Sequence, residues 1–194
     1  MKIDAAPRIL AVAVTCAVIL IGFVANEGAA RANGQEVLMP VEGTDPRDLL
    51  SGHYVQLAFN QRLDPDEHCP APQNGDWAAL RSRGDIYVVV GGAGSRAEAE
   101  QVGPVLVKAR YTCSPPSPPT GNDAPGAPGN VHLDLSIDRF YVSQAEAQRI
   151  EAALAAQRND ASRRVLAIVS VGRDGIARLK GLVIDNQRLE LNWL

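Results

Sequence analysis

The chain has 194 residues, a length that suits one folded domain and not comfortably two. Its formal net charge of −3 gives no electrostatic basis for binding nucleic acid, and an aromatic content of 5 % argues against a wide stacking platform for bases or sugars. Apolar residues make up 46 % and charged residues 21 %, so most of the chain should be globular.

The first feature along the chain is an uncharged apolar run from Ile9 to Ala25. As a helix it would be ~25 Å long, slightly short of a ~30 Å hydrocarbon core and longer than the core of a usual signal peptide. Lys2 and Arg8 precede the run, which predicts that residues 1–8 are cytoplasmic. We therefore expect an uncleaved single-span anchor at 9–25, with the domain in the periplasm of a bacterium.

Two alternatives to the anchor remain open. Small residues at Gly28-Ala29-Ala30 and Ala30-Arg31-Ala32 offer sites for removal of a signal peptide, and the run could also be a buried helix of a soluble protein. Cys16 is followed by nine more uncharged residues of the run, so it is a poor lipidation site and is expected to face the membrane. Residues 26–34 are predicted to be a spacer before a domain at 35–194.

The domain sequence alternates short strand patterns with breaks rich in proline and glycine. Strands are predicted at 35–41, 53–59, 85–90, 104–112, 131–137, 164–171, 176–184 and 188–194. Asp174-Gly175 and Asp185-Asn186 predict the turns of two hairpins among the last three strands. Residues 60–76 are predicted to be a polar loop, and 114–130, with six prolines, a mobile one.

Two helices are predicted in the domain. Ser95 precedes a short helix ending near Val102, and Ser143 precedes a longer one ending near Gln157. In both, a glutamate follows the serine by three residues, which is the spacing of a capping box. The expected fold class is α+β, mainly antiparallel sheet with about eight strands, one longer and one short helix, preceded by a single transmembrane helix.

The segment Gly52-His53-Tyr54-Val55-Gln56-Leu57-Ala58-Phe59 resembles the signature of the GDYXXLXY family, membrane-anchored bacterial proteins of unknown function. Asp138-Arg139-Phe140-Tyr141, placed before the longer helix, resembles a second hallmark of that family, and 174–182 resembles its C-terminal hairpin. His53 stands where the signature has Asp, and Phe59 where it has Tyr. If that Asp had a catalytic role, this chain would lack it.

The simplest interpretation of the signature is structural, because Gly52 suits a turn and the residues of 53–59 alternate along a strand, with Tyr54 on one face and Leu57 and Phe59 on the other. The resemblance covers about residues 35–190 plus the apolar run. It implies an accessory protein of the inner membrane, with a multi-span membrane protein as a possible partner. Asp138 and Arg139 are expected to tether the second hallmark to the first, near Arg47 or Asp48, with a recognition patch as the alternative.

Outside the apolar run the sequence has two cysteines, Cys69 and Cys113. An even number in an oxidising compartment favours a disulfide, which would close a loop of about 44 residues and contribute ~4 kcal/mol by chain entropy. Two free thiols and shared metal ligation are the alternatives.

The sequence gives less support to a catalytic site. Asp64, Asp66, Glu67, His68 and Cys69 are metal-ligating residue types, but neighbours in sequence cannot readily converge on one ion. A Ser/Lys hydrolase would need Ser51 or Ser170 to meet Lys108 or Lys180.

Gly91-Gly92-Ala93-Gly94 lacks the Lys-Ser/Thr of a phosphate-binding loop and is better explained as the turn that ends a strand. We expect no metal, no cofactor and no nucleic acid. The expected function is a non-catalytic interaction or assembly module for a membrane partner, and the alternative is a periplasmic enzyme, either a Ser/Lys hydrolase or metal-dependent through His68 and Cys69.

Overall fold

The computed structural model describes residues 5–43, 54–73, 75–117, 126–137, 139–160 and 163–190. Within them the fold is α+β, with antiparallel sheets and three helices, as predicted. The helices are α1 (Ala5–Asn33), α2 (Arg96–Val102) and α3 (Gln144–Asn159). The strands are β1 (Gln35–Pro40), β2 (Glu42–Gly43), β3 (Tyr54–Leu63), β4 (Trp77–Arg83), β5 (Ile86–Ala93), β6 (Val105–Lys108), β7 (Arg110–Ser114), β8 (Gly129–Asp134), β9 (Arg139–Tyr141), β10 (Val165–Val171), β11 (Ala177–Ile184) and β12 (Gln187–Glu190).

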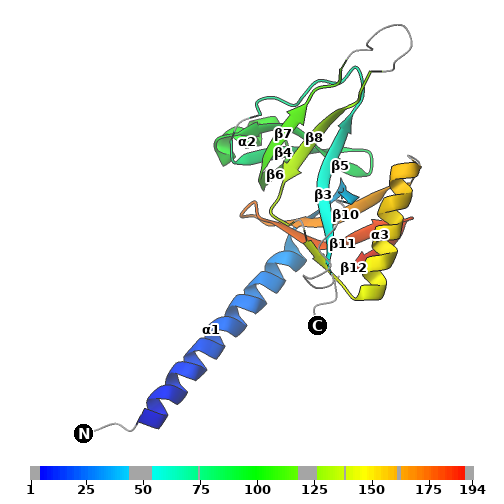
Figure 1. Ribbon diagram of the computed structural model, residues 1–194. Coiled ribbons are helices and arrows are strands. Elements are labelled where there is room, and N and C mark those ends of the chain that lie inside the picture. The colour runs from blue at the N-terminus through cyan, green and yellow to red at the C-terminus, as the bar shows by residue number, and fades with distance from the viewer. Residues whose placement is uncertain are drawn as a thin grey trace.

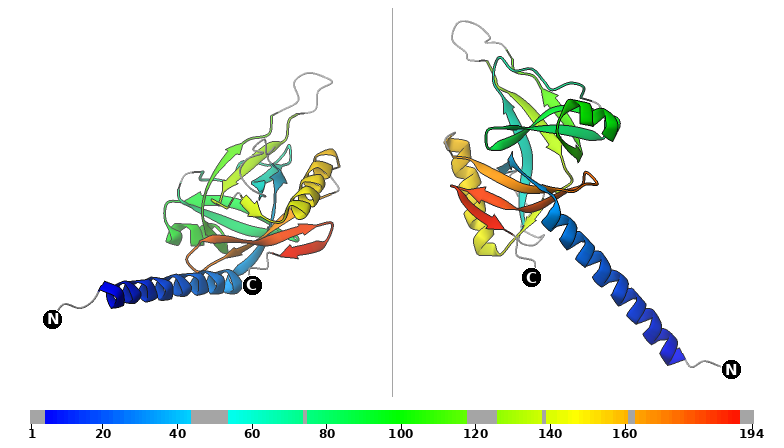
Figure 2. Two further views of the ribbon diagram at one scale, coloured as in Figure 1. Left: turned by 60° about the horizontal axis from the view of Figure 1, so that its bottom comes forward. Right: turned by 180° about the vertical axis from the view of Figure 1, so that it is seen from behind.

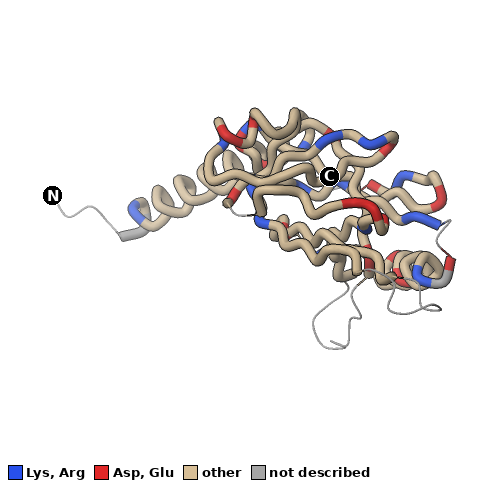
Figure 3. Tube along the Cα trace, turned by 90° about the horizontal axis from the view of Figure 1, so that it is seen from above, with Lys and Arg blue, Asp and Glu red and all other residues tan. Residues whose placement is uncertain are grey.

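Helix α1 projects from the domain as one long rod (Figure 1). Its segment Pro7–Asn33 is long and apolar enough to cross a membrane, and none of its most apolar stretch is buried against the domain. Charged residues are absent from most of the length of α1, whereas they are spread over the domain (Figure 3).

Residues 26–33, expected to be a spacer, are instead the last turns of α1. Three alanines in this stretch favour the helix, and Gly28 alone does not end it. The chain then enters β1 directly through Gly34, where a Cβ atom would lie only 2.1 Å from Ser170 Oγ. The helix is therefore joined to the domain without a flexible linker.

The sheet nearest α1 has the order β1-β10-β11-β12. Strand β1 pairs antiparallel with β10, with Val37 opposite Val169, and every residue of β10 is buried. The hairpin between β11 and β12 turns at Asp185 and Asn186, whose φ angles of 47° and 66° fit a two-residue turn of the type that the sequence predicts.

A second sheet has the order β2-β3-β8-β7, with β9 also paired to β3, and a third has the order β5-β4-β6. Strand β3 alternates between buried and partly exposed residues, so Val55, Leu57 and Phe59 face the core. Its arrow runs away from the end of the domain where α1 is attached (Figure 1). The sheets and α3 share one hydrophobic cluster.

The structure adds strands that the sequence pattern concealed. Strand β4 was not predicted, because its sequence WAALRSR follows a polar loop and does not alternate. The single strand expected at 104–112 is two strands separated at Ala109, which belong to different sheets. The capping predictions are confirmed: Ser143 and Glu146 form a capping box on α3, and Ser95 accepts a hydrogen bond from the Glu98 amide on α2.

Candidate functional site at the junction of helix and domain

The last turns of α1 are bound to the domain through Arg178 of β11. This side chain is only 9 % exposed, and it donates from Nε and Nη2 to the two carboxylate oxygens of Glu27, with 3.2 Å for the Nη2 bond. A third bond joins Arg178 Nη2 to Asp174 Oδ2 at 3.3 Å. Two-point contact between guanidinium and carboxylate is the strong, directional form of an ion pair.

The charges around Arg178 stabilise one another. The hydrogen bonds that Arg178 donates to Glu27 have the largest effect on its pKa, and together with the bond to Asp174 they outweigh burial and raise that pKa. The pKa of Asp174 is lowered, first by the backbone amide of Ile176 and also by Arg178. A buried guanidinium that lost Glu27 would keep only one carboxylate partner, so this contact fixes the helix against β11.

A second set of charges continues the contact along the sheet. Arg31, one turn after Glu27, donates from Nη2 to the carbonyl of Lys180 at 2.8 Å. Glu36 binds Lys180 Nζ and, at 3.0 Å, Arg188 Nη2. These hydrogen bonds, with Lys180 the larger contributor, lower the pKa of Glu36. We call the set formed by Glu27, Arg31, Glu36, Asp174, Arg178, Lys180 and Arg188 the junction.

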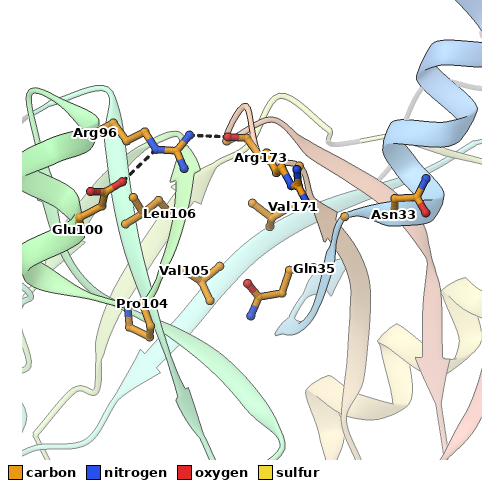
Figure 4. A pocket seen from close by; sticks show the side chains of 12 residues that line it. Asn33, Gln35, Arg96, Glu100, Pro104, Val105, Leu106, Val171 and Arg173 are labelled. Atoms are coloured by element: carbon orange, nitrogen blue, oxygen red, sulfur yellow. Dashed lines mark hydrogen bonds and ion pairs between the residues drawn. The ribbon is translucent and has the colours of Figure 1, made fainter.

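A groove of about 410 Å³ opens beside the junction (Figure 4). It lies between the end of α1, α2, β6 and the turn that joins β10 to β11, and Gln35, Glu100, Val105 and Arg173 are among its lining residues. Arg96 closes one side: it donates to the backbone carbonyl of Arg173 and, at 3.2 Å, to Glu100. A pocket of about 420 Å³ shares Asn33 and Arg173 with the groove and continues to Asn26 and Ala29 of α1.

The two family-like motifs meet in the second sheet. Strand β9 pairs with the start of β3, with Tyr54 opposite Tyr141 and Val55 opposite Phe140. The rings of Tyr54 and Tyr141 are 5.8 Å apart, and the guanidinium carbon of Arg139 lies 5.4 Å from the centre of the Tyr54 ring. Phe140 is 1 % exposed.

Leu57 and Phe59 are buried in the core, which agrees with a packing role for this part of the signature. A phenyl ring at position 59 needs no hydrogen-bond partner there. Gly52, His53 and Asp138, together with Arg47 and Asp48, lie outside the described residues. The tether that the structure shows between the motifs is therefore the β3–β9 pairing and the contact of Arg139 with Tyr54.

Cys69 and Cys113 are joined in a disulfide, which attaches the loop after β3 to β7. Tyr111, two residues before Cys113, donates its hydroxyl proton toward the carbonyls of Pro72 and Pro70, at 2.6 and 3.0 Å. Burial raises the pKa of Tyr111 to about 12. Local sequence patterns do not indicate that Tyr111 anchors this loop, because only the fold brings it to the two prolines.

Three of the four residues considered for a Ser/Lys hydrolase lie in the part of the chain that the structure describes. Ser170 is fully buried, and Lys180 is paired with Glu36. The ammonium of Lys108 lies 5.6 Å from the centre of the Trp77 ring. Ser51 lies outside the described residues.

The hypothesis of a metal site at His68 and Cys69 loses its sulfur ligand, because the Cys69 sulfur is bonded to Cys113. Across the ranges that the structure describes, no three His, Cys, Asp or Glu side chains gather as a metal site. Gly91 and Gly92 are part of β5, so they do not form the turn that was expected to end this strand.

The family model described as GDYXXLXY protein matches residues 16–182, which is most of the chain. No curated protein and no solved structure matches the chain.

Proposed function

The chain belongs to the GDYXXLXY family, and from this premise we propose that it is a single-span protein of the bacterial inner membrane whose periplasmic domain is a non-catalytic interaction or assembly module for a membrane partner. The observation that carries the proposal is the contact of Glu27 with Arg178, which holds the domain on the end of its own membrane helix. A module that presents a surface to a neighbour in the same membrane needs a domain that keeps one orientation relative to its membrane helix.

Two features support this orientation, one before the apolar run and one in the domain. Lys2 and Arg8 precede the apolar run, which favours a cytoplasmic N-terminus. The Cys69–Cys113 bond suits an oxidising compartment, and the periplasm is one.

The junction also favours an anchor that is retained. Both candidate cleavage sites lie within α1, and cleavage after Ala30 or Ala32 would remove Glu27 from the buried Arg178. A protease needs an accessible, extended chain, which a helix held by these contacts does not offer.

The surface offered to the partner is the groove between α1, α2 and the β10–β11 turn. Polar Gln35 and Glu100 line the groove beside apolar Val105 and Leu106, and we expect this mixture to suit the polar loops of a multi-span protein better than a wholly apolar segment.

A photo-crosslinking amino acid placed at Gln35 or Glu100 in cells tests this function, with Arg62 of β3 as the matched exposed control. We expect one membrane protein to be crosslinked from positions 35 and 100 and not from 62. Equal labelling from all three positions, or labelling of soluble proteins only, would contradict the proposal.

A further inference from the structure

The exposed large apolar side chains of the described residues have an uneven distribution. Those outside α1 are Ile176, 44 % exposed, and Tyr141, 55 % exposed. Ile176 belongs to the turn between β10 and β11, and Tyr141 ends β9. Both elements lie toward the end of the domain from which α1 leaves, whereas the β7 and β8 ends near residues 114 and 129 lie at the far end (Figures 1 and 2).

The depth of the β10–β11 turn follows from its neighbours on α1. The apolar run ends at Ala25, and the pocket beside the turn is lined by Asn26, Ala29 and Ala30. At 1.5 Å per residue, Ala29 and Ala30 lie ~6–8 Å beyond Ala25 along the helix axis. The headgroup layer of a bilayer is ~5–8 Å thick on each side. The turn therefore reaches the depth of the lipid headgroups when Ala25 lies at the edge of the hydrocarbon core.

The charged side chains near the turn are compatible with a position among the lipid headgroups. Arg178 is held by Glu27 and Asp174, and Lys180 and Arg188 by Glu36. Arg173 is different, because its guanidinium is exposed and forms no ion pair with another residue that the structure describes. The guanidinium of Arg173 can bind a lipid phosphate, while the exposed apolar side chain of Ile176, three positions later, can lie among the upper acyl carbons.

The second contact point has the chemistry of an interfacial aromatic. Tyr141 packs its ring on Tyr54, and Arg139 lies over the other ring of the pair. Tyrosine is enriched at membrane interfaces, because its ring is apolar and its hydroxyl remains hydrated.

We propose that this end of the domain rests on the lipid headgroups of the leaflet into which α1 passes. Ile176 and Tyr141 enter the interfacial layer, and Arg173 binds a lipid phosphate. With α1 as the third point of support, these contacts set the tilt of the domain as well as its height. The inference relies on the anchoring in the proposed function, and it is independent of any protein partner.

The test uses the full chain with Cys16→Ser, reconstituted in nanodiscs of phosphatidylcholine with or without phosphatidylglycerol. An environment-sensitive dye is attached at Ile176→Cys or Tyr141→Cys, and at Arg62→Cys as the distal control. Nitroxide lipids then report contact with the bilayer. We expect blue-shifted emission and severalfold stronger quenching at 176 and 141 than at 62.

Arg173 supplies a charge-specific arm of the same experiment. In discs that contain phosphatidylglycerol, Arg173→Glu should weaken the quenching at 176, and Arg173→Lys should retain it. Equal quenching at 176, 141 and 62 overturns the inference. Protection of the 176 dye only after a membrane extract is added also overturns it, in favour of a protein that covers the turn.

A dye at Val18→Cys separates this inference from the proposed function. Strong quenching at 18 with none at 176 or 141 leaves the anchor intact and removes only the headgroup contact. Absence of quenching at 18 means that α1 does not enter the bilayer, and then the proposed function fails as well.

Discussion

Glu27 of α1 and Arg178 of β11 are 151 positions apart in the chain, yet they form a two-point ion pair that joins the long apolar helix to the sheet. Arg178 contributes a nearly buried side chain to this pair, and Glu27 one that is 50 % exposed. The pair therefore fixes the orientation of α1 relative to β11 at residues 26–34, where the sequence predicted a spacer.

Glu27→Gln should destabilise the full chain by about 1 kcal/mol, because it removes the charge from a partly screened pair with a buried arginine. The apparent melting temperature in detergent, followed by circular dichroism, measures this. Glu100→Gln is the matched control, since the Arg96–Glu100 pair has both side chains at least half exposed. An equal effect of the two variants would mean that burial of Arg178 adds nothing.

Acid should loosen the junction. Asp174 and Glu36 have lowered pKa values in the fold, so the stability they supply is present above the ordinary carboxyl pKa of about 4 and is lost as the pH falls through the lower folded values. The double variant Asp174→Asn, Glu36→Gln should show a flatter decline in melting temperature below about pH 4 than the parent. Parallel declines in the two proteins would refute the assignment.

Tyr111 should ionise well above the ordinary tyrosine pKa of about 10. Burial raises its pKa to about 12, so the stability linked to its neutral form is complete below pH ~10 and is lost as the pH rises through 12. Absorbance of phenolate at alkaline pH should show a late step, and Tyr111→Phe should abolish that step. A late step that persists in Tyr111→Phe would assign it to another residue.

Loss of the disulfide should cost up to ~4 kcal/mol, the chain-entropy value for a loop of this length. Cys69→Ser with Cys113→Ser removes the bond while keeping similar side-chain sizes. We expect a lower melting temperature and faster proteolysis of residues 64–73, which the bond and Tyr111 both hold. Unchanged stability in the double variant would show that the Tyr111 contacts suffice.

Gly175→Ala should destabilise the β10–β11 turn by ~1–3 kcal/mol for two reasons. Its φ of +78° disfavours a side chain, and a Cβ atom would lie 2.4 Å from the Trp77 ring. Alanine at Gly84, which also has a positive φ but open space around it, is the control for the backbone effect alone. Similar losses at the two positions would mean that the Trp77 contact is unimportant.

Local patterns in the sequence predicted the apolar helix, both capped helices, the terminal hairpins and the disulfide. Each of these depends on residues a few positions apart or, for the cysteines, on having a single possible partner. The sequence did not reveal β4, whose burial follows from neighbours on both sides and not from alternation. The junction was also missed, because the sequence spacing does not indicate that Arg178 lies beside residues 26–33.

The most direct test of the fixed orientation of the domain on α1 is the distance between spin labels at Val24→Cys and Arg62→Cys, measured by pulsed electron paramagnetic resonance in nanodiscs with Cys16→Ser. If Glu27 and Arg178 fix the domain on α1, the distance distribution is single and narrow, and it broadens in Glu27→Gln. A broad distribution already present without that substitution would show that the domain moves freely on its helix and would contradict the account.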